Sequence, residues 1–215
     1  DITNPETCLK IALQEKVDGV LHICSEVAMP ALGLINEKMG LAGLDTATVN
    51  IATNKNAMRR AFERGGAPSP QSIGASTEDE VVDAARLIGA TVIVKPSRNS
   101  GSRGITRVAA GAPEAELQAA FQRAIAESRD PSVVVEQFVE GPEFSIEALV
   151  WNETPHVLTV TDKVTTGFPY FVEIGHSQPS RFPKSVQDSI VNSVILGLKA
   201  MHLDWCAVHA EVKMT

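Results

Sequence analysis

The sequence predicts an α/β fold, on three observations. Up to about residue 131, apolar residues at helical spacing alternate with short runs of β-branched residues. From Ser132 onward, most stretches alternate apolar and polar side chains with the period of two that strands require. Between these regions, residues 92–108 have the pattern of a strand, a small cationic loop and a second strand.

The composition is that of an ordinary globular protein. The chain has 215 residues, 44% hydrophobic and 21% charged, enough for one large or two small domains. A net charge of -7 argues against broad nucleic-acid binding. No apolar run approaches the roughly 20 residues that a membrane span needs, and no signal-peptide pattern opens the chain. We therefore expect a cytoplasmic protein with neither nucleic acid nor membrane as a partner.

The three cysteines are Cys8, Cys24 and Cys206, an odd number spread through apolar sequence. Their spacing fits no metal site. We expect buried free thiols in a reducing compartment.

Residues 1–43 predict one helix–strand–helix unit. Asn4 caps a helix over 5–14, and 17–23 has the apolar pattern of a buried strand of a parallel sheet. A second helix over 28–39 ends at Gly40 or Gly43. One such unit cannot bury a sheet alone, so either the chain is truncated or further strands lie upstream.

Three more helices are predicted before residue 131. Asn54 caps a helix that Gly65-Gly66 ends, and Pro68 and Pro70 then form an extended linker. The capping-box spacing of 77–80 opens the second helix, and Pro113 starts the third.

Strands dominate the remainder of the chain. We expect strands at 133–139, 143–150, 156–161, within 167–175 after a loop, and at 207–214, with one long helix over 183–202. In the second strand the apolar and polar members face opposite ways: Phe144, Ile146 and Ala148 against Glu143, Ser145 and Glu147. In the last strand, His209 and Glu211 share the polar face.

The loop between the strands of 92–108 is suited to an anion. Gly101 and Gly104 lack a Cβ, so backbone amides can approach phosphate oxygens closely. Arg98, Ser100, Ser102 and Arg103 add hydroxyl and guanidinium donors. Lys95 ends a run that should be buried, so its charge needs a partner, and a nucleotide phosphate would serve. A solvated Ser/Gly turn is the competing interpretation.

Three stretches in order resemble the ATP-grasp superfamily. Residues 92–96 with their Ser/Gly loop lie roughly forty residues before Glu-Gln-Phe-Val-Glu-Gly-Pro-Glu-Phe at 136–144. The loop at 100–104, together with Phe-Val-Glu-Ile-Gly-His-Ser-Gln-Pro-Ser at 171–180, most resembles the carboxylate–amine, L-amino-acid ligase branch. The resemblance implies two α+β subdomains that clasp ATP, at 51–138 and 139–215. They follow the remainder of a Rossmann-like parallel-sheet domain at 1–50.

The resemblance also implies a nucleotide site. Lys95 would contact the α-phosphate, and Lys55 resembles the second phosphate lysine. The flap over the β- and γ-phosphates would consist of Ser100, Gly101, Ser102, Arg103 and Gly104.

The segment that links the subdomains would bind the base and the sugar. It comprises Glu136, Gln137, Phe138 and Val139. The backbone at Gln137 and Val139 would bind the adenine edge, and Glu136 would accept a hydrogen bond from the exocyclic amine. Glu143 would hold the ribose hydroxyls.

Glu211 resembles the first of two carboxylates that bind Mg²⁺, with Mn²⁺ as an alternative. Lys163 and His176 resemble residues on the acyl-acceptor side, and with Arg103 they form the expected catalytic set. The second metal motif of the family, Glu-x-Asn followed by Pro-Arg, would fall beyond Thr215. The chain could therefore bind a nucleotide while lacking the complete catalytic machinery. The competing interpretations are an exposed strand residue for Glu211 and a polar loop residue for His176.

The function implied is ADP-forming ligation, in which ATP phosphorylates a carboxylate and an amine then attacks the acylphosphate. The partners would be ATP and small carboxylate and amine substrates, amino acids among them, in a homodimer. Two alternatives stay open: an enzyme that uses bicarbonate, such as a carboxylase or a carbamoyl-phosphate synthase, and a nucleotide-binding module without turnover.

Overall fold

The computed structural model describes residues 1–23, 25–167 and 172–215. The chain begins with helices: α1 (Pro5–Glu15), the short 3-10 helix η1 (Glu26–Ala28), α2 (Met29–Met39), α3 (Thr46–Thr53) and α4 (Lys55–Gly65). Asn4 and Asn54 cap α1 and α4 by accepting from a backbone N–H three residues on, and Gly40 and Gly66 end α2 and α4 in the left-handed conformation. These predicted caps are confirmed.

The first sheet is antiparallel, in the order β1-β4-β2-β3. Its strands are β1 (Ser72–Ala75), β2 (Val92–Pro96), β3 (Thr106–Val108) and β4 (Val133–Gln137). Helices α5 (Glu78–Ile88) and α6 (Glu114–Glu127) cover one face, and the apolar core between helices and sheet includes Val81, Val94, Ala120 and Val135. Thr77 caps α5 by accepting from the N–H of Glu80, as the capping-box spacing predicts.

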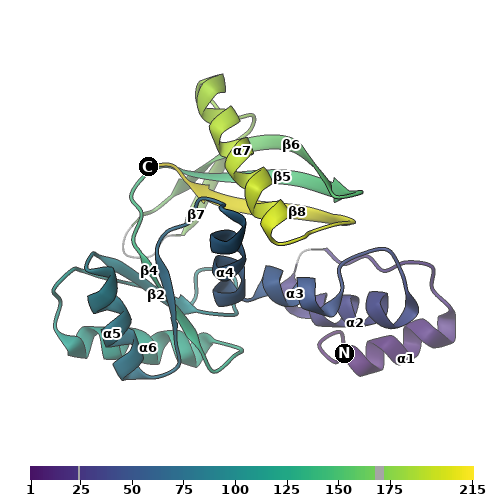
Figure 1. The fold of residues 1–215 in the computed structure, drawn as a ribbon, viewed down its shortest axis with the longest axis horizontal. Coiled ribbons are helices and arrows are strands. Elements are labelled where there is room, and N and C mark those ends of the chain that lie inside the picture. The colour runs from purple at the N-terminus through teal and green to yellow at the C-terminus, as the bar shows by residue number, and fades with distance from the viewer. Residues whose placement is uncertain (24, 168–171) are drawn as a thin grey trace.

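The second sheet is also antiparallel, in the order β7-β6-β5-β8. Its strands are β5 (Glu143–Trp151), β6 (Thr154–Thr165), β7 (Glu173–Ser177) and β8 (Cys206–Lys213). Helix α7 (Lys184–Ala200) lies across the face that points away from the first sheet (Figure 1). Phe144 and Ile146 on that face are fully buried against α7, so the alternation predicted for β5 is confirmed.

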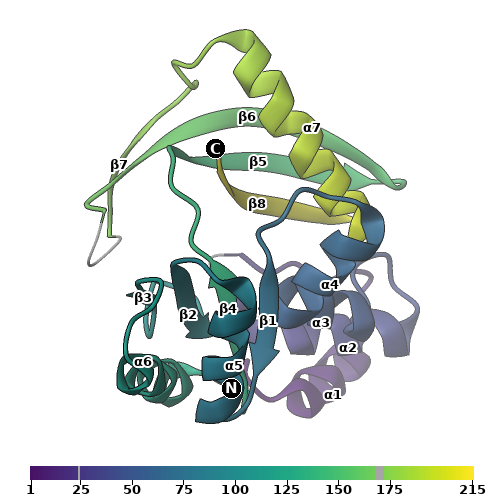
Figure 2. The same ribbon diagram turned by 60° about the vertical axis from the view of Figure 1, so that its left-hand side comes forward.

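The opposite, polar face of the second sheet looks toward the first sheet, and residues 138–142 connect the two (Figure 2). The core of the second sheet also takes in Leu44, Val49 and Ala61, from α4 and the segment before it. Helix α4 therefore packs against the core of the second sheet, while its first residue, Lys55, donates its backbone N–H to the carbonyl of Ser97 after β2.

The strand predicted at 17–23 is wrong. The stretch carries no regular structure, and the side chains of Leu21 and Ile23 are 85% and 69% exposed. No described strand runs beside it, and a strand needs a partner for its backbone groups. The prediction also omitted α3, whose β-branched sequence is a weak helix former. Its cap at Asp45 and the buried Val49 stabilise it.

Two of the three cysteines can be described. Cys8 and Cys206 are free and half-buried, and burial raises the pKa of Cys206 to about 11. Cys24 lies outside the described residues, as does Phe171 of the stretch at 171–180. In the described part of the chain, no helix is both long and apolar enough to cross a membrane.

Candidate functional site

A buried cluster of three charges lies on the first sheet. Glu136 in β4 is 4% exposed, and its two carboxylate oxygens accept from Arg59 Nε at 2.6 Å and from Lys95 Nζ at 2.6 Å. The neighbouring strands β2 and β4 bring Lys95 and Glu136 together, and Arg59 reaches them from α4. The cluster therefore fixes α4 onto the sheet.

The pKa values in this cluster follow from burial and from the neighbouring charges. Burial alone would raise the pKa of Glu136, but Lys95 and Arg59 outweigh it and lower the pKa to about 2. Burial lowers the pKa of Lys95, and the attraction of Glu136 opposes this. Glu136 is thus ionised at neutral pH, and Lys95 is a desolvated cation that a further anion would stabilise.

Lys55 is the first residue of α4 and lies against the loop after β2. Its Nζ donates to the carbonyl of Asn99 at 2.7 Å, and its backbone N–H donates to the carbonyl of Ser97 at 2.9 Å. Burial lowers the pKa of Lys55, and repulsion from Lys95 lowers it further. Lys55 therefore lies beside the loop with a carbonyl oxygen as its hydrogen-bond partner, near Lys95, which pairs with Glu136.

The loop itself has the conformation that its glycines allow. Gly101, Ser102 and Gly104 have φ values of 75°, 55° and 70°. A Cβ at Gly104 would lie 3.1 Å from the carbonyl oxygen of Arg123, so a side chain there would crowd α6. Arg103 folds back to donate to the Asn99 side chain at 3.1 Å.

A cleft of about 600 Å³ lies where the two sheets are joined. Its lining includes Phe138 of the connection, together with Glu143, Lys163 and Lys213 of the second sheet. Lys213 Nζ lies 2.9 Å from Glu143 and 5.2 Å from the centroid of the Phe138 ring, and Arg107 lies 4.8 Å from the same ring. The N–H of Gln137 donates to the carbonyl of Gln71 at 2.9 Å, so a ligand would find that donor already engaged.

The second sheet contributes a more open cluster. Lys163 in β6 has a side chain that is 7% exposed and lies between Glu173 of β7, at 3.0 Å, and Glu211 of β8. Burial alone would lower the pKa of Lys163, but its hydrogen bonds to the two carboxylates outweigh burial and raise it. His176 Nε2 lies 2.9 Å from Glu173, whose pKa is lowered mainly by its hydrogen bond with Lys163.

The two clusters face the same space. The charge of Glu211 acts on both Lys55 and Lys95, although these lysines belong to the opposite wall. Cations on one wall and a carboxylate that is 64% exposed on the other suit a polyphosphate with a divalent cation. Mg²⁺ is commonly held by one or two carboxylates plus phosphates, so Glu211 fits this role. Among residues 1–23, 25–167 and 172–215, no three His, Cys, Asp or Glu side chains are grouped so that they could hold a metal ion by themselves.

The structure places Lys55, Lys95 and the loop beside the first sheet, and Glu211 on the second sheet, paired with Lys163. Of the predicted site residues, Phe138, Glu143 and Lys163 line the cleft. Sequence reasoning missed three residues that form ion pairs with the predicted site residues Glu136, Lys163 and Glu143. Arg59 follows Lys55 by one helical turn, Glu173 precedes His176 by three residues, and Lys213 shares the strand face of Glu211. These spacings could have indicated each partner.

Comparison with known proteins agrees with the resemblance that the sequence motifs indicate. The family model for the ATP-grasp domain matches residues 88–215, more than half of the chain. The alanine–anticapsin ligase of Bacillus subtilis is 25% identical over 97% of this chain and 48% of that protein.

Two solved structures share the fold. The L-amino acid ligase of Bacillus licheniformis superposes with a TM-score of 0.81 at 25% identity, covering 98% of this chain and 48% of that chain. The biotin carboxylase domain of Hydrogenobacter thermophilus 2-oxoglutarate carboxylase, a dimer with MgADP and bicarbonate, superposes with a TM-score of 0.79. It is 18% identical, covering 97% of this chain and 48% of that chain, and shows the fold alone. The chain spans about half the length of these proteins.

Proposed function

Because the chain belongs to the ATP-grasp family, we propose that it carries the nucleotide site of an ADP-forming carboxylate–amine ligase. The observation that supports this most strongly is the arrangement of Lys55 and Lys95 opposite Glu211, which matches the charges of a metal-bound triphosphate.

The reaction proceeds in two steps. A carboxylate oxygen of the first substrate attacks the γ-phosphorus of ATP, the bond from that phosphorus to the bridging oxygen breaks, and ADP leaves. The amine of the second substrate then attacks the acyl carbon of the acylphosphate. Inorganic phosphate leaves, the amine loses a proton, and an amide bond has formed.

Each wall of the cleft has a part in this chemistry. Lys55, Lys95 and the backbone amides of residues 100–104 neutralise charge that develops on the transferring phosphoryl group. Arg103 leaves its contact with Asn99 to reach the γ-phosphate when the loop closes. Closure excludes water, which would otherwise hydrolyse the acylphosphate.

The base and ribose occupy the 600 Å³ cleft at the connection between the sheets. Glu143 holds the ribose hydroxyls, Phe138 lines the adenine pocket, and the backbone of Val139 binds the adenine edge. Glu136 acts mainly through Lys95 and Arg59, because both of its oxygens already accept from these cations.

Mg²⁺, with Mn²⁺ as a substitute, would be held by Glu211 and the phosphates, where it would neutralise charge on the phosphoryl oxygens. Lys163 pairs with Glu211, His176 lies opposite Lys163 on the neighbouring strand, and both orient the substrates. Amino acids are the proposed substrates, supported by the likeness to the alanine–anticapsin ligase and the L-amino acid ligase. The protein is proposed to act as a homodimer.

The test is phosphate release from Mg·ATP by the full-length protein in the presence of paired amino acids. The proposal predicts release that requires particular amino acids and is lost in Lys95→Met. The exposed Lys199→Met at the end of α7 is the matched control and should retain activity. Release that bicarbonate stimulates and amino acids do not would indicate a carboxylase. Nucleotide binding without turnover under any acceptor would indicate a binding module.

A further inference from the structure

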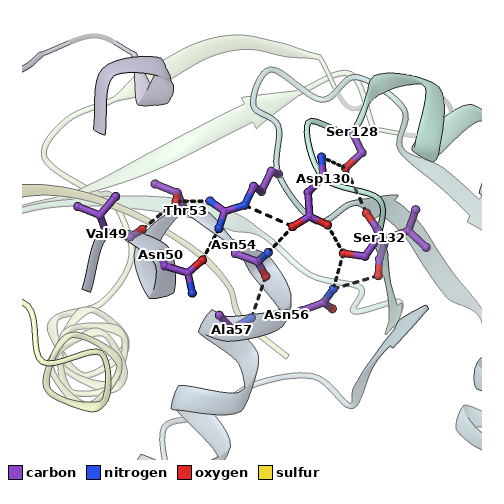
Figure 3. Close-up of polar contacts among 11 residues, drawn as sticks. Val49, Asn50, Thr53, Asn54, Asn56, Ala57, Ser128, Asp130 and Ser132 are labelled. Atoms are coloured by element: carbon purple, nitrogen blue, oxygen red, sulfur yellow. Dashed lines mark hydrogen bonds and ion pairs between the residues drawn. The ribbon is translucent and has the colours of Figure 1, made fainter. Parts of the chain in front are cut away.

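Asp130 lies at the centre of a polar network behind the phosphate loop (Figure 3). Its Oδ2 accepts from Asn54 Nδ2 at 3.0 Å and lies 3.4 Å from Arg98 Nε. Its Oδ1 accepts from the Ser132 hydroxyl at 2.5 Å. One carboxylate thus joins its own segment to two others that are far away in the sequence.

The first of these segments is the start of α4. The side-chain oxygen of Asn54 accepts from the N–H of Ala57 at 3.0 Å, and its amide nitrogen donates to Asp130. Asn54 therefore both caps the helix and ties it to Asp130. Because Lys55 follows directly, this contact fixes where the Lys55 ammonium begins its reach toward the loop.

The second segment is the root of the phosphate loop. Arg98 donates to the hydroxyl of Thr53 at 2.7 Å and to the side chain of Asn50, both in α3, and pairs with Asp130. The carbonyl of Arg98 also accepts from the N–H of Arg129 at 3.2 Å. The residue just before the loop 99–104 is therefore held by the same carboxylate that holds the start of α4.

We propose that Asp130 is a positioning residue that acts through Asn54 and Arg98. It holds Lys55 and the loop 99–104 in a fixed position relative to each other, so that both can contact the phosphates of one nucleotide. The inference rests on the proposed function, because it assigns the two elements to one ligand. Asp130 and Arg98 have side chains that are 22% and 26% exposed, so solvent screens their contacts only in part.

The sharpest variant is Asn54→Ser. Serine is as good an N-cap as asparagine, but it is too short to reach Asp130 and has no amide donor. The helix keeps its cap and loses only the link. Asn4→Ser is the matched control, because Asn4 caps α1 in the same way, by accepting from the N–H of Thr7 at 2.9 Å.

Two readouts test the inference: the Kd for Mg·ADP by calorimetry, and hydrogen exchange of residues 98–104 without nucleotide. For Asn54→Ser we expect a Kd raised by roughly fivefold to tenfold, the effect of losing one charge-assisted hydrogen bond. We also expect faster exchange in the loop. Asn4→Ser should leave both readouts at their wild-type values.

A double-variant cycle with Asp130→Asn separates positioning from a general loss of structure. If Asn54 acts through Asp130, the double variant binds Mg·ADP about as well as the weaker single variant. A folded Asn54→Ser protein with wild-type loop exchange and a Kd within about twofold of wild type would overturn the inference, as would additive effects in the cycle. Wild-type protein that binds no Mg·ADP would overturn the proposed function instead, and loop exchange alone would then decide the inference.

Discussion

Each of the two sheets places a lysine against one or two carboxylates, but the sheets bury these carboxylates to different degrees. On the first sheet, Lys95 pairs with Glu136, whose side chain is 5% exposed. On the second sheet, the side chains of Glu173 and Glu211, which flank Lys163, are 40% and 64% exposed.

The difference in burial indicates different roles for the two clusters. A buried ion pair cannot exchange partners without a large desolvation cost, so the contacts among Arg59, Lys95 and Glu136 are a fixed support. Exposed carboxylates can leave one partner for another at little cost. Under the proposed function, Glu211 would therefore turn from Lys163 toward a cation on the nucleotide, whereas Glu136 would stay in place.

The largest expected effect is on stability, from Glu136→Gln. The substitution keeps the side-chain volume but leaves Lys95 and Arg59 without their buried counter-charge. We expect the free energy of unfolding in urea to fall by about 3 to 5 kcal/mol. The matched change on the other wall, Glu173→Gln, should cost less than about 1 kcal/mol, because its ion pair is screened by solvent. Equal losses for the two variants would remove the distinction between the walls.

Lowering the pH should remove the stability that the buried contacts of Glu136 provide. The pKa of Glu136 is lowered from 4.5 to about 2 in the folded protein, so the stability it provides is present above the unfolded pKa and is lost as the pH falls. Between about pH 5 and pH 2, the advantage of wild type over Glu136→Gln should shrink by about 3 kcal/mol. Urea unfolding of both proteins at several pH values measures this. A constant difference across that range would contradict the lowered pKa.

A smaller effect is expected for Glu211→Gln, and on binding instead of stability. The amide is a poorer ligand for Mg²⁺ than the carboxylate, so Mg²⁺ should strengthen ADP binding about tenfold less than in wild type. Calorimetric titration with and without Mg²⁺ measures the difference. The control is Glu147→Gln, which should match wild type. Glu147 lies in β5 on the same face of the second sheet as Glu211 and pairs with His209 at 2.7 Å.

Most of the features that the sequence predicted correctly depend on local sequence patterns. The caps at Asn54 and Thr77, the alternation in β5 and β8, and the glycine positions in the loop depend on neighbouring residues, so the sequence predicts them directly. The placement of Lys95 and Glu136 on adjacent strands depends on register, which periodicity does not predict. The resemblance to a family indicated both residues as part of a nucleotide site, but it did not predict their ion pair.

The remaining features depend on contacts between distant segments. Arg59 and Glu136 are 77 residues apart, and Asn54 and Asp130 are 76 apart, so no local pattern pairs them. The strand prediction for residues 17–23 failed for a different reason, because there a local pattern was present and the distant contact was not. Its apolar pattern is that of a buried strand, but a strand also requires a neighbour, which a local pattern cannot supply.

The most direct test of the account is the position of a metal–nucleotide complex between the walls. In crystals grown with ADP and Mn²⁺, we expect the anomalous signal of the metal at the carboxylate of Glu211. The α-phosphate should lie within hydrogen-bond reach of Lys95 Nζ, and Lys55 Nζ should reach a phosphate oxygen of the same nucleotide. ADP and Mn²⁺ bound elsewhere, with Glu211 still paired to Lys163, would contradict the account.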